Sequence, residues 1–139
     1  MRLMARAHQL PARWAAGAFI LNSGLNKLSA DEETAAGVHG MAGAVYPALK
    51  DRDPVEFTGL LGKAEVALGT ALLLPVVPSA LAGAALTAFA GGLLGIYLKT
   101  PGLREEGTVR PTQQGIAFAK DVWLLGIGLS LLVEELRGR

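Results

Sequence analysis

The fold of this chain is decided by residues 57–99, FTGLLGKAEVALGTALLLPVVPSALAGAALTAFAGGLLGIYLK. Two apolar runs, 57–74 and 80–98, are expected to face each other across a turn marked by Pro75 and Pro78. Each run is close to the roughly 20 residues that a helix needs to cross the hydrocarbon core of a bilayer. The stretch therefore predicts a transmembrane helical hairpin.

The composition of the whole chain favours a membrane protein. Of its 139 residues 51% are hydrophobic, and the mean hydropathy is +0.38. The 13 basic and 12 acidic residues nearly cancel, which excludes a nucleic-acid partner because such proteins carry a basic stripe. The absence of cysteine excludes disulfides and thiol chemistry. The 18 glycines suit close helix packing in a lipid bilayer and association into a homo-oligomer.

Two more spans are expected, one on each side of the hairpin. Residues 10–28 form the first, with Arg13 and Lys27 extending to the two interfaces. Residues 115–133 form the last. The prediction is an all-α integral membrane four-helix bundle, a single domain over 1–139 with both termini on the same side. The orienting tendency of the first helix favours cytoplasmic termini in a prokaryotic cell membrane.

A short amphipathic helix is expected between the first and second spans. Ser29 and Glu32 have the spacing of a capping box, which starts a helix. The segment that follows is too polar to span, so we expect it to lie on the interface and cap the bundle. Its apolar residues recur at helical spacing: Val38, Met41, Val45 and Leu49.

Three polar side chains lie at similar depths in the expected spans. At about 1.5 Å per residue, Glu65 lies roughly 12 Å below the start of its helix and Asp121 roughly 9 Å below the start of its own. Asn22, counted back from the end of the first span, also lies roughly 9 Å below the same surface. Because charge within a bilayer is costly and usually functional, we expect a polar pocket in one leaflet for a proton, a cation or a polar head group.

Helical phase turns these carboxylates toward the bundle interior. Glu65 shares a stripe with Gly62, Gly69 and Leu72, so Glu65 and Asp121 can face each other. Two carboxylates at low dielectric disfavour double ionisation unless a lysine approaches. Lysines available for this are Lys27, Lys99 and Lys120. The alternative is that the carboxylates only pair with a lysine and fix the helix register.

Histidine and aromatic residues suggest structural roles. His39 is a secondary pocket candidate, but no second histidine lies at metal-ligand spacing, so no metal is expected. Trp14, Tyr97 and Trp123 lie near or toward span ends, where aromatic rings anchor helices at the interface.

Three motifs resemble those of DoxX-like membrane proteins. The first helix fits the pattern R-x3-G-x-F-x4-G-x2-KL, the segment 62–69 (GKAEVALG) is similar to that family's glutamate–glycine second helix, and Ala119-Lys120-Asp121 is similar to the charged start of its last helix. The resemblance covers nearly the whole chain and implies a four-helix membrane bundle. The residues that match in the first helix are Arg13, Gly17, Phe19, Gly24, Lys27 and Leu28.

The resemblance implies a small membrane subunit of a quinone-linked or oxidative-stress redox assembly, because the family is named after a membrane subunit of thiosulfate:quinone oxidoreductase. A quinone is then the cofactor to consider, and a membrane or peripheral redox protein is the partner. The family offers no strict catalytic signature, so whether the chain is an enzyme stays open. The second hypothesis is a non-catalytic transport or scaffolding bundle. The pocket residues under the first hypothesis are Glu65, Asp121, Asn22 and Lys27.

Overall fold

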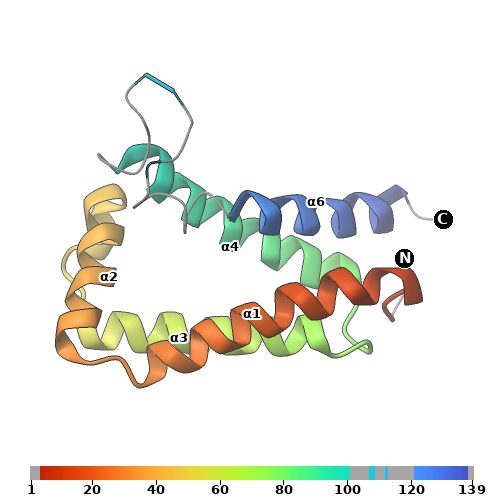
Figure 1. Cartoon of the computed structure of the whole chain (residues 1–139), viewed down its shortest axis with the longest axis horizontal. Coiled ribbons are helices and arrows are strands. Elements are labelled where there is room, and N and C mark those ends of the chain that lie inside the picture. The colour runs from red at the N-terminus through yellow and green to blue at the C-terminus, as the bar shows by residue number, and fades with distance from the viewer. Residues whose placement is uncertain (1–3, 101–106, 109–111, 113–120, 138–139) are drawn as a thin grey trace.

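The computed structural model describes residues 4–100, 107–108, 112 and 121–137, and all regular structure within these ranges is helical. The predicted all-α class is thus confirmed (Figure 1). Two short 3-10 helices, η1 (Ala7–Gln9) and η2 (Pro47–Leu49), accompany the α-helices. The α-helices are α1 (Leu10–Leu28), α2 (Glu32–Val45), α3 (Pro54–Leu73), α4 (Ser79–Lys99) and α6 (Asp121–Arg137).

The bounds of α1, α3 and α4 agree closely with the predicted spans. α6 ends at Arg137 rather than at residue 133, and the predicted start at residue 115 lies outside the described residues. α1 has the predicted bounds, and α3 and α4 meet at the predicted break. α3 begins at Pro54 rather than at residue 57 because Asp53 caps it. The Asp53 carboxylate accepts a hydrogen bond of 2.9 Å from the amide of Glu56, and proline is well suited to the first helical position.

The long helices form two close pairs, α1 with α3 and α4 with α6. Glycines lie at the points of closest approach in both pairs. A Cβ on Gly24 of α1 would lie 2.7 Å from the carbonyl oxygen of Gly62 on α3. A Cβ on Gly83 of α4 would lie 2.9 Å from the carbonyl oxygen of Gly128 on α6. Because these positions have no side chain, the paired backbones can touch.

The two halves of the predicted hairpin do not pack along each other. α3 and α4 are joined by the turn containing Pro75 and Pro78, yet each makes most of its contacts with its own partner. Figure 1 shows the pairs as two tiers that meet near the two termini and spread apart at the other end. The prediction that 57–74 and 80–98 face each other is therefore wrong, because the glycines that permit close approach oppose one another within the pairs.

α2 lies between the two tiers at the end away from the termini (Figure 1) and contacts α3 and α4. The Tyr46 hydroxyl donates a hydrogen bond of 2.7 Å to the carbonyl of Gly92 on α4. The cap of α2 was predicted wrongly, since Asp31 rather than Ser29 accepts the amide of Thr34 at 2.8 Å. α2 thus holds the two pairs apart at this end of the molecule.

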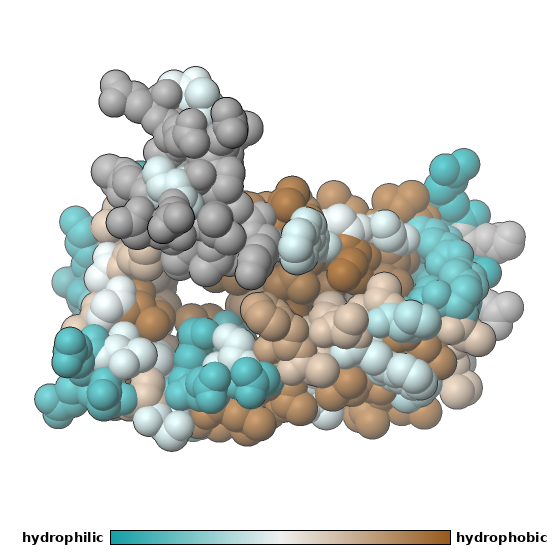
Figure 2. Space-filling model, viewed as in Figure 1, coloured by the Kyte–Doolittle hydropathy of each residue, from teal (hydrophilic) through white to brown (hydrophobic). Residues whose placement is uncertain are grey.

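Among the described helices, α4 alone is long and apolar enough to cross a membrane, with a mean hydropathy of 1.8. Only 33% of its apolar window is buried inside the molecule. Large apolar side chains are exposed on the other long helices as well, and Figure 2 shows apolar surface along both tiers. Tyr97, expected as an interfacial anchor, is instead buried. The exposed residues include Trp14, Phe19, Leu60, Leu81 and Trp123.

Candidate functional site

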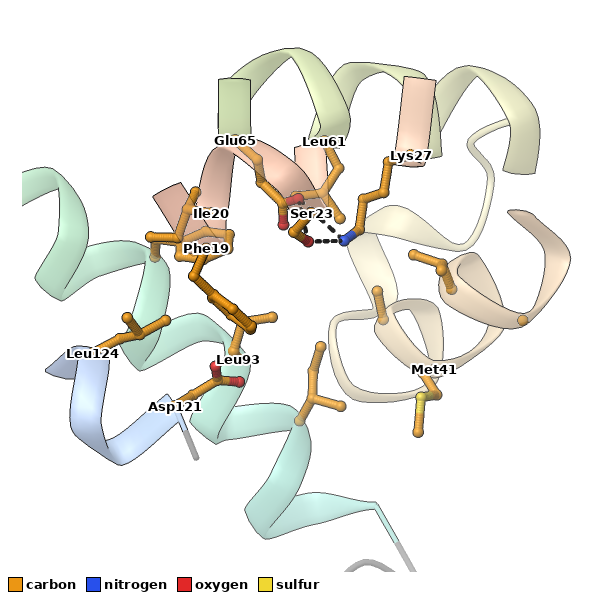
Figure 3. Close-up of a pocket in the computed structure, with 15 residues that line it drawn as sticks. Phe19, Ile20, Ser23, Lys27, Met41, Leu61, Glu65, Leu93, Asp121 and Leu124 are labelled. Atoms are coloured by element: carbon orange, nitrogen blue, oxygen red, sulfur yellow. Dashed lines mark hydrogen bonds and ion pairs between the residues drawn. The ribbon is translucent and has the colours of Figure 1, made fainter. Parts of the chain in front are cut away.

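A cavity of about 480 Å³ lies where α2 holds the two pairs apart. All five described α-helices line it, and Figure 2 shows an opening through the molecule in this region. Its walls are mainly apolar, with Phe19, Met41, Phe89 and Leu93 among the large side chains. Among the described residues, four polar side chains interrupt these walls (Figure 3): Ser23, Lys27, Glu65 and Asp121.

One wall carries a hydrogen-bonded trio of Ser23, Lys27 and Glu65. The Lys27 ammonium lies 3.1 Å from Glu65 Oε1 and donates to Ser23 Oγ at 2.8 Å. The Ser23 hydroxyl in turn donates to Glu65 Oε1 at 2.9 Å. Since Glu65 is 2% exposed, the ammonium compensates a carboxylate that is almost completely buried.

The close contact between α1 and α3 positions this trio. Ser23 and Lys27 are four residues apart and therefore share one face of α1. Gly24 lies between them in the sequence, and a Cβ there would come within 2.9 Å of the Glu65 Cβ. The glycine therefore lets α3 approach until the Glu65 carboxylate reaches both partners on α1.

Asp121 occupies the opposite wall, at the start of the described part of α6 (Figure 3). Its side chain lines the cavity and is 7% exposed. Within the described part of the chain, its carboxylate forms neither a hydrogen bond nor an ion pair. Glu65, Asp121 and Lys27, all predicted for one pocket, line the same cavity.

The other predicted site residues lie elsewhere. Asn22 is exposed and does not line the cavity, because each helical step turns by about 100° and presents Ser23 instead. Lys99 is exposed at the end of α4, and Lys120 lies outside the described residues. His39 Nε2 lies 2.7 Å from the Leu49 carbonyl and connects α2 to η2. The spacing of Ser23 from Lys27 is the signal that could have identified the serine.

Arg13 lies in a second polar cluster, which no motif in the sequence indicates. Its side chain is fully buried rather than extended to an interface, so that prediction is wrong. All five of its N–H groups donate, to the carbonyls of Ala71, Leu72, Leu74 and Val77 and to Ser79 Oγ, at 2.7 to 3.0 Å. We call the connected set the terminal cluster: Arg6, His8, Gln9, Arg13, Ser79, Glu134 and Glu135.

Gln9 connects Arg13 to the C-terminal end of α6. Ser79, which accepts from Arg13, donates to Gln9 Oε1 at 2.7 Å, and the Gln9 amide donates to both Glu134 and Glu135. Hydrogen bonds from Gln9 and His8 hold the pKa of Glu134 below its ordinary value. The terminal cluster thus connects the N-terminal segment, the turn between α3 and α4, and α6.

No family model, curated protein or solved structure matches this chain significantly. Among the described residues, no three His, Asp or Glu side chains gather as metal ligands would.

Proposed function

We propose that this chain is a small integral membrane protein of the DoxX-like kind, with four spans over about 10–28, 57–74, 80–98 and 115–133. The apolar character and low burial of α4 support this, because the most apolar helix of a water-soluble bundle is normally the most buried. α1 and α3 are less apolar than α4 because they contain charged residues such as Arg13, Lys27 and Glu65. These charges are hydrogen-bonded inside the bundle, so lipid would not contact them.

We further propose that the cavity takes the polar head of a lipid-soluble molecule within a quinone-linked or oxidative-stress redox assembly. The observation that carries this proposal is an apolar cavity with Lys27, Glu65 and Asp121 on facing walls. Such cavities, apolar with few polar groups, are typical of small-molecule sites. A quinone is the ligand that the family resemblance suggests, with electrons supplied by a membrane or peripheral redox protein.

The test is to purify the protein from native membranes and measure the quinone that copurifies. Asp121→Ala and Glu65→Ala should lower the amount of bound quinone. Gly37 lines the cavity, and a Cβ there meets nothing within 4 Å, so Gly37→Leu should fill the cavity without a clash. Gly40→Leu is the matched control, because Gly40 is equally open but outside the cavity. Quinone absent from the wild type, or unchanged in Gly37→Leu, contradicts this function.

A transport or scaffolding role is the second candidate, and the ion pair between Lys27 and Glu65 favours it. In that case the pair fixes the register of α1 on α3, and Glu65→Gln chiefly lowers the thermal unfolding midpoint. A Glu65→Gln protein with normal stability that has lost bound quinone argues against a purely structural pair. Lys99, the other expected partner, lies outside the cavity.

A further inference from the structure

Asp121 is a polar residue of the cavity whose carboxylate has no hydrogen-bond or ion-pair partner among the described residues. On the facing wall, Glu65 receives hydrogen bonds from both Ser23 and Lys27. The Asp121 carboxylate receives none within the described part of the chain, although the residue is only 7% exposed. Figure 3 shows it on the wall opposite the trio. Buried polar groups normally have a partner, and the cavity beside Asp121 has room for one that a ligand brings.

The charges of the cavity indicate what kind of partner this is. Among the described residues that line the cavity, two carboxylates, Glu65 and Asp121, face one ammonium, Lys27, so one negative charge is uncompensated when both carboxylates are ionised. An unpaired buried charge is costly, and a single positive charge would remove that cost. An anionic head would instead face a site whose cation is already engaged with Glu65.

The volume and walls of the cavity indicate the body of the ligand. A cavity of about 480 Å³ falls within the range of sites that hold molecules of drug-like size. Phe19, Met41, Phe89 and Leu93 present apolar surface that an ion alone would leave uncovered. The occupant therefore needs a hydrocarbon part as well as a charged head.

We infer that the cavity binds an amphiphile with a protonated amine head and a hydrocarbon body, with the ammonium beside Asp121 and the body against the apolar walls. This inference rests on the proposed function for the membrane setting of the cavity. It goes beyond that function by naming a second class of ligand for the same cavity, one whose head carries the positive charge that a quinone lacks.

The experiment compares three probes of equal chain length, dodecylamine, dodecanol and dodecanoate, added to the purified full-length protein in phosphatidylcholine nanodiscs. Binding to the folded state raises the thermal unfolding midpoint with probe concentration. Dodecylamine should raise the midpoint most. In Asp121→Asn, which keeps the shape of the side chain, the apparent affinity for dodecylamine should fall about ten- to a hundredfold, as expected for a charged hydrogen bond.

Gly37→Leu keeps the inference testable even if Asp121→Asn folds poorly, and Gly40→Leu reports the effect of the added side chain alone. The amine response should be lost in Gly37→Leu and retained in Gly40→Leu. Equal responses to amine and alcohol, both lost in Gly37→Leu, would overturn the cationic head while leaving the cavity of the proposed function intact. An amine response unchanged in both Asp121→Asn and Gly37→Leu would also overturn the inference, and the quinone measurement would then decide the proposed function separately.

Discussion

Arg13 is a buried cation that carbonyl groups, rather than a carboxylate, compensate. Four backbone carbonyls and the Ser79 hydroxyl accept its five N–H groups around the end of α3 and the turn to α4. The C-terminal end of a helix carries a partial negative charge, which favours a cation there. A single side chain of α1 thus satisfies the last carbonyls of α3, which would otherwise lack partners.

Replacement of Arg13 by lysine should lower the free energy of unfolding by about 3 kcal/mol or more, because lysine has three donors at one point and leaves buried carbonyls unpaired. Arg52→Lys is the matched control, since Arg52 is exposed, and should change stability by less than about 0.5 kcal/mol. Denaturant unfolding of both variants in the same detergent measures the difference. Equal stability of Arg13→Lys and wild type would mean that the guanidinium geometry is unimportant.

Glu134 makes part of the stability depend on pH. Its pKa lies below the ordinary value of 4.5 because Gln9 and His8 hydrogen-bond to the ionised carboxylate. A lowered pKa in the folded state adds stability that is present above the unfolded pKa and lost as pH falls through the folded pKa. The stability advantage of the wild type over Glu134→Gln at pH 6 should therefore shrink as pH falls below 4.5. Unfolding midpoints measured from pH 6 downward test this, and a difference that does not change with pH contradicts it.

At the scale of the element, close backbone approach decides which helices pair. The stripe of Gly62, Glu65, Gly69 and Leu72 was predicted to face the interior, and all four residues are buried. The partner of this stripe was not predictable from helical phase alone, because phase gives the direction of a face on one helix and says nothing of what packs against it. Gly17 and Gly24 of α1 supply the complementary surface.

Gly24→Ala should therefore destabilise the pair of α1 and α3. The new Cβ would lie 2.7 Å from the Gly62 carbonyl oxygen and 2.8 Å from the Val66 amide nitrogen, so the helices must separate. We expect a loss of about 1–3 kcal/mol in the free energy of unfolding. Gly126→Ala on α6 is the control, because a Cβ there meets nothing within 4 Å and alanine favours helix. Equal effects of the two substitutions would show that close contact is not limiting.

At the scale of the whole molecule, the two pairs meet near the termini and are held apart by α2 at the other end (Figure 1). The terminal cluster joins them at the first end, and Tyr46 contacts α4 at the second. The cavity is a consequence of this arrangement, because the separated pairs leave space that side chains do not fill.

The absence of native cysteine makes the proposed membrane topology directly testable. Val76 is 63% exposed in the turn between α3 and α4, and Arg52 is exposed just before α3. With four spans, a membrane-impermeant maleimide should label Val76→Cys from the same side as the termini and Arg52→Cys from the opposite side. Ala18→Cys, exposed at the middle of α1 and outside the cavity lining, should be labelled only after detergent is added. Labelling of Val76→Cys and Arg52→Cys from one side would contradict the topology.

The sequence by itself determined the helices and the phase of their polar residues. Proline and aspartate fixed the ends of α3, and helical phase placed Glu65 and Asp121 on interior faces. Lys27, expected at an interface, pairs instead with Glu65. These properties are local, since capping and helical periodicity depend on residues within a few positions of one another.

Only the tertiary structure decided which helices pair and which polar groups meet. The helices pair as α1 with α3 and α4 with α6 and not as the expected hairpin. Ser23, and not the predicted Asn22, donates to Glu65, and Arg13 is buried among the carbonyls of another helix. Such contacts join residues far apart in the chain. They depend on differences of a few tenths of an ångström in the separation of two backbones, which no local pattern encodes.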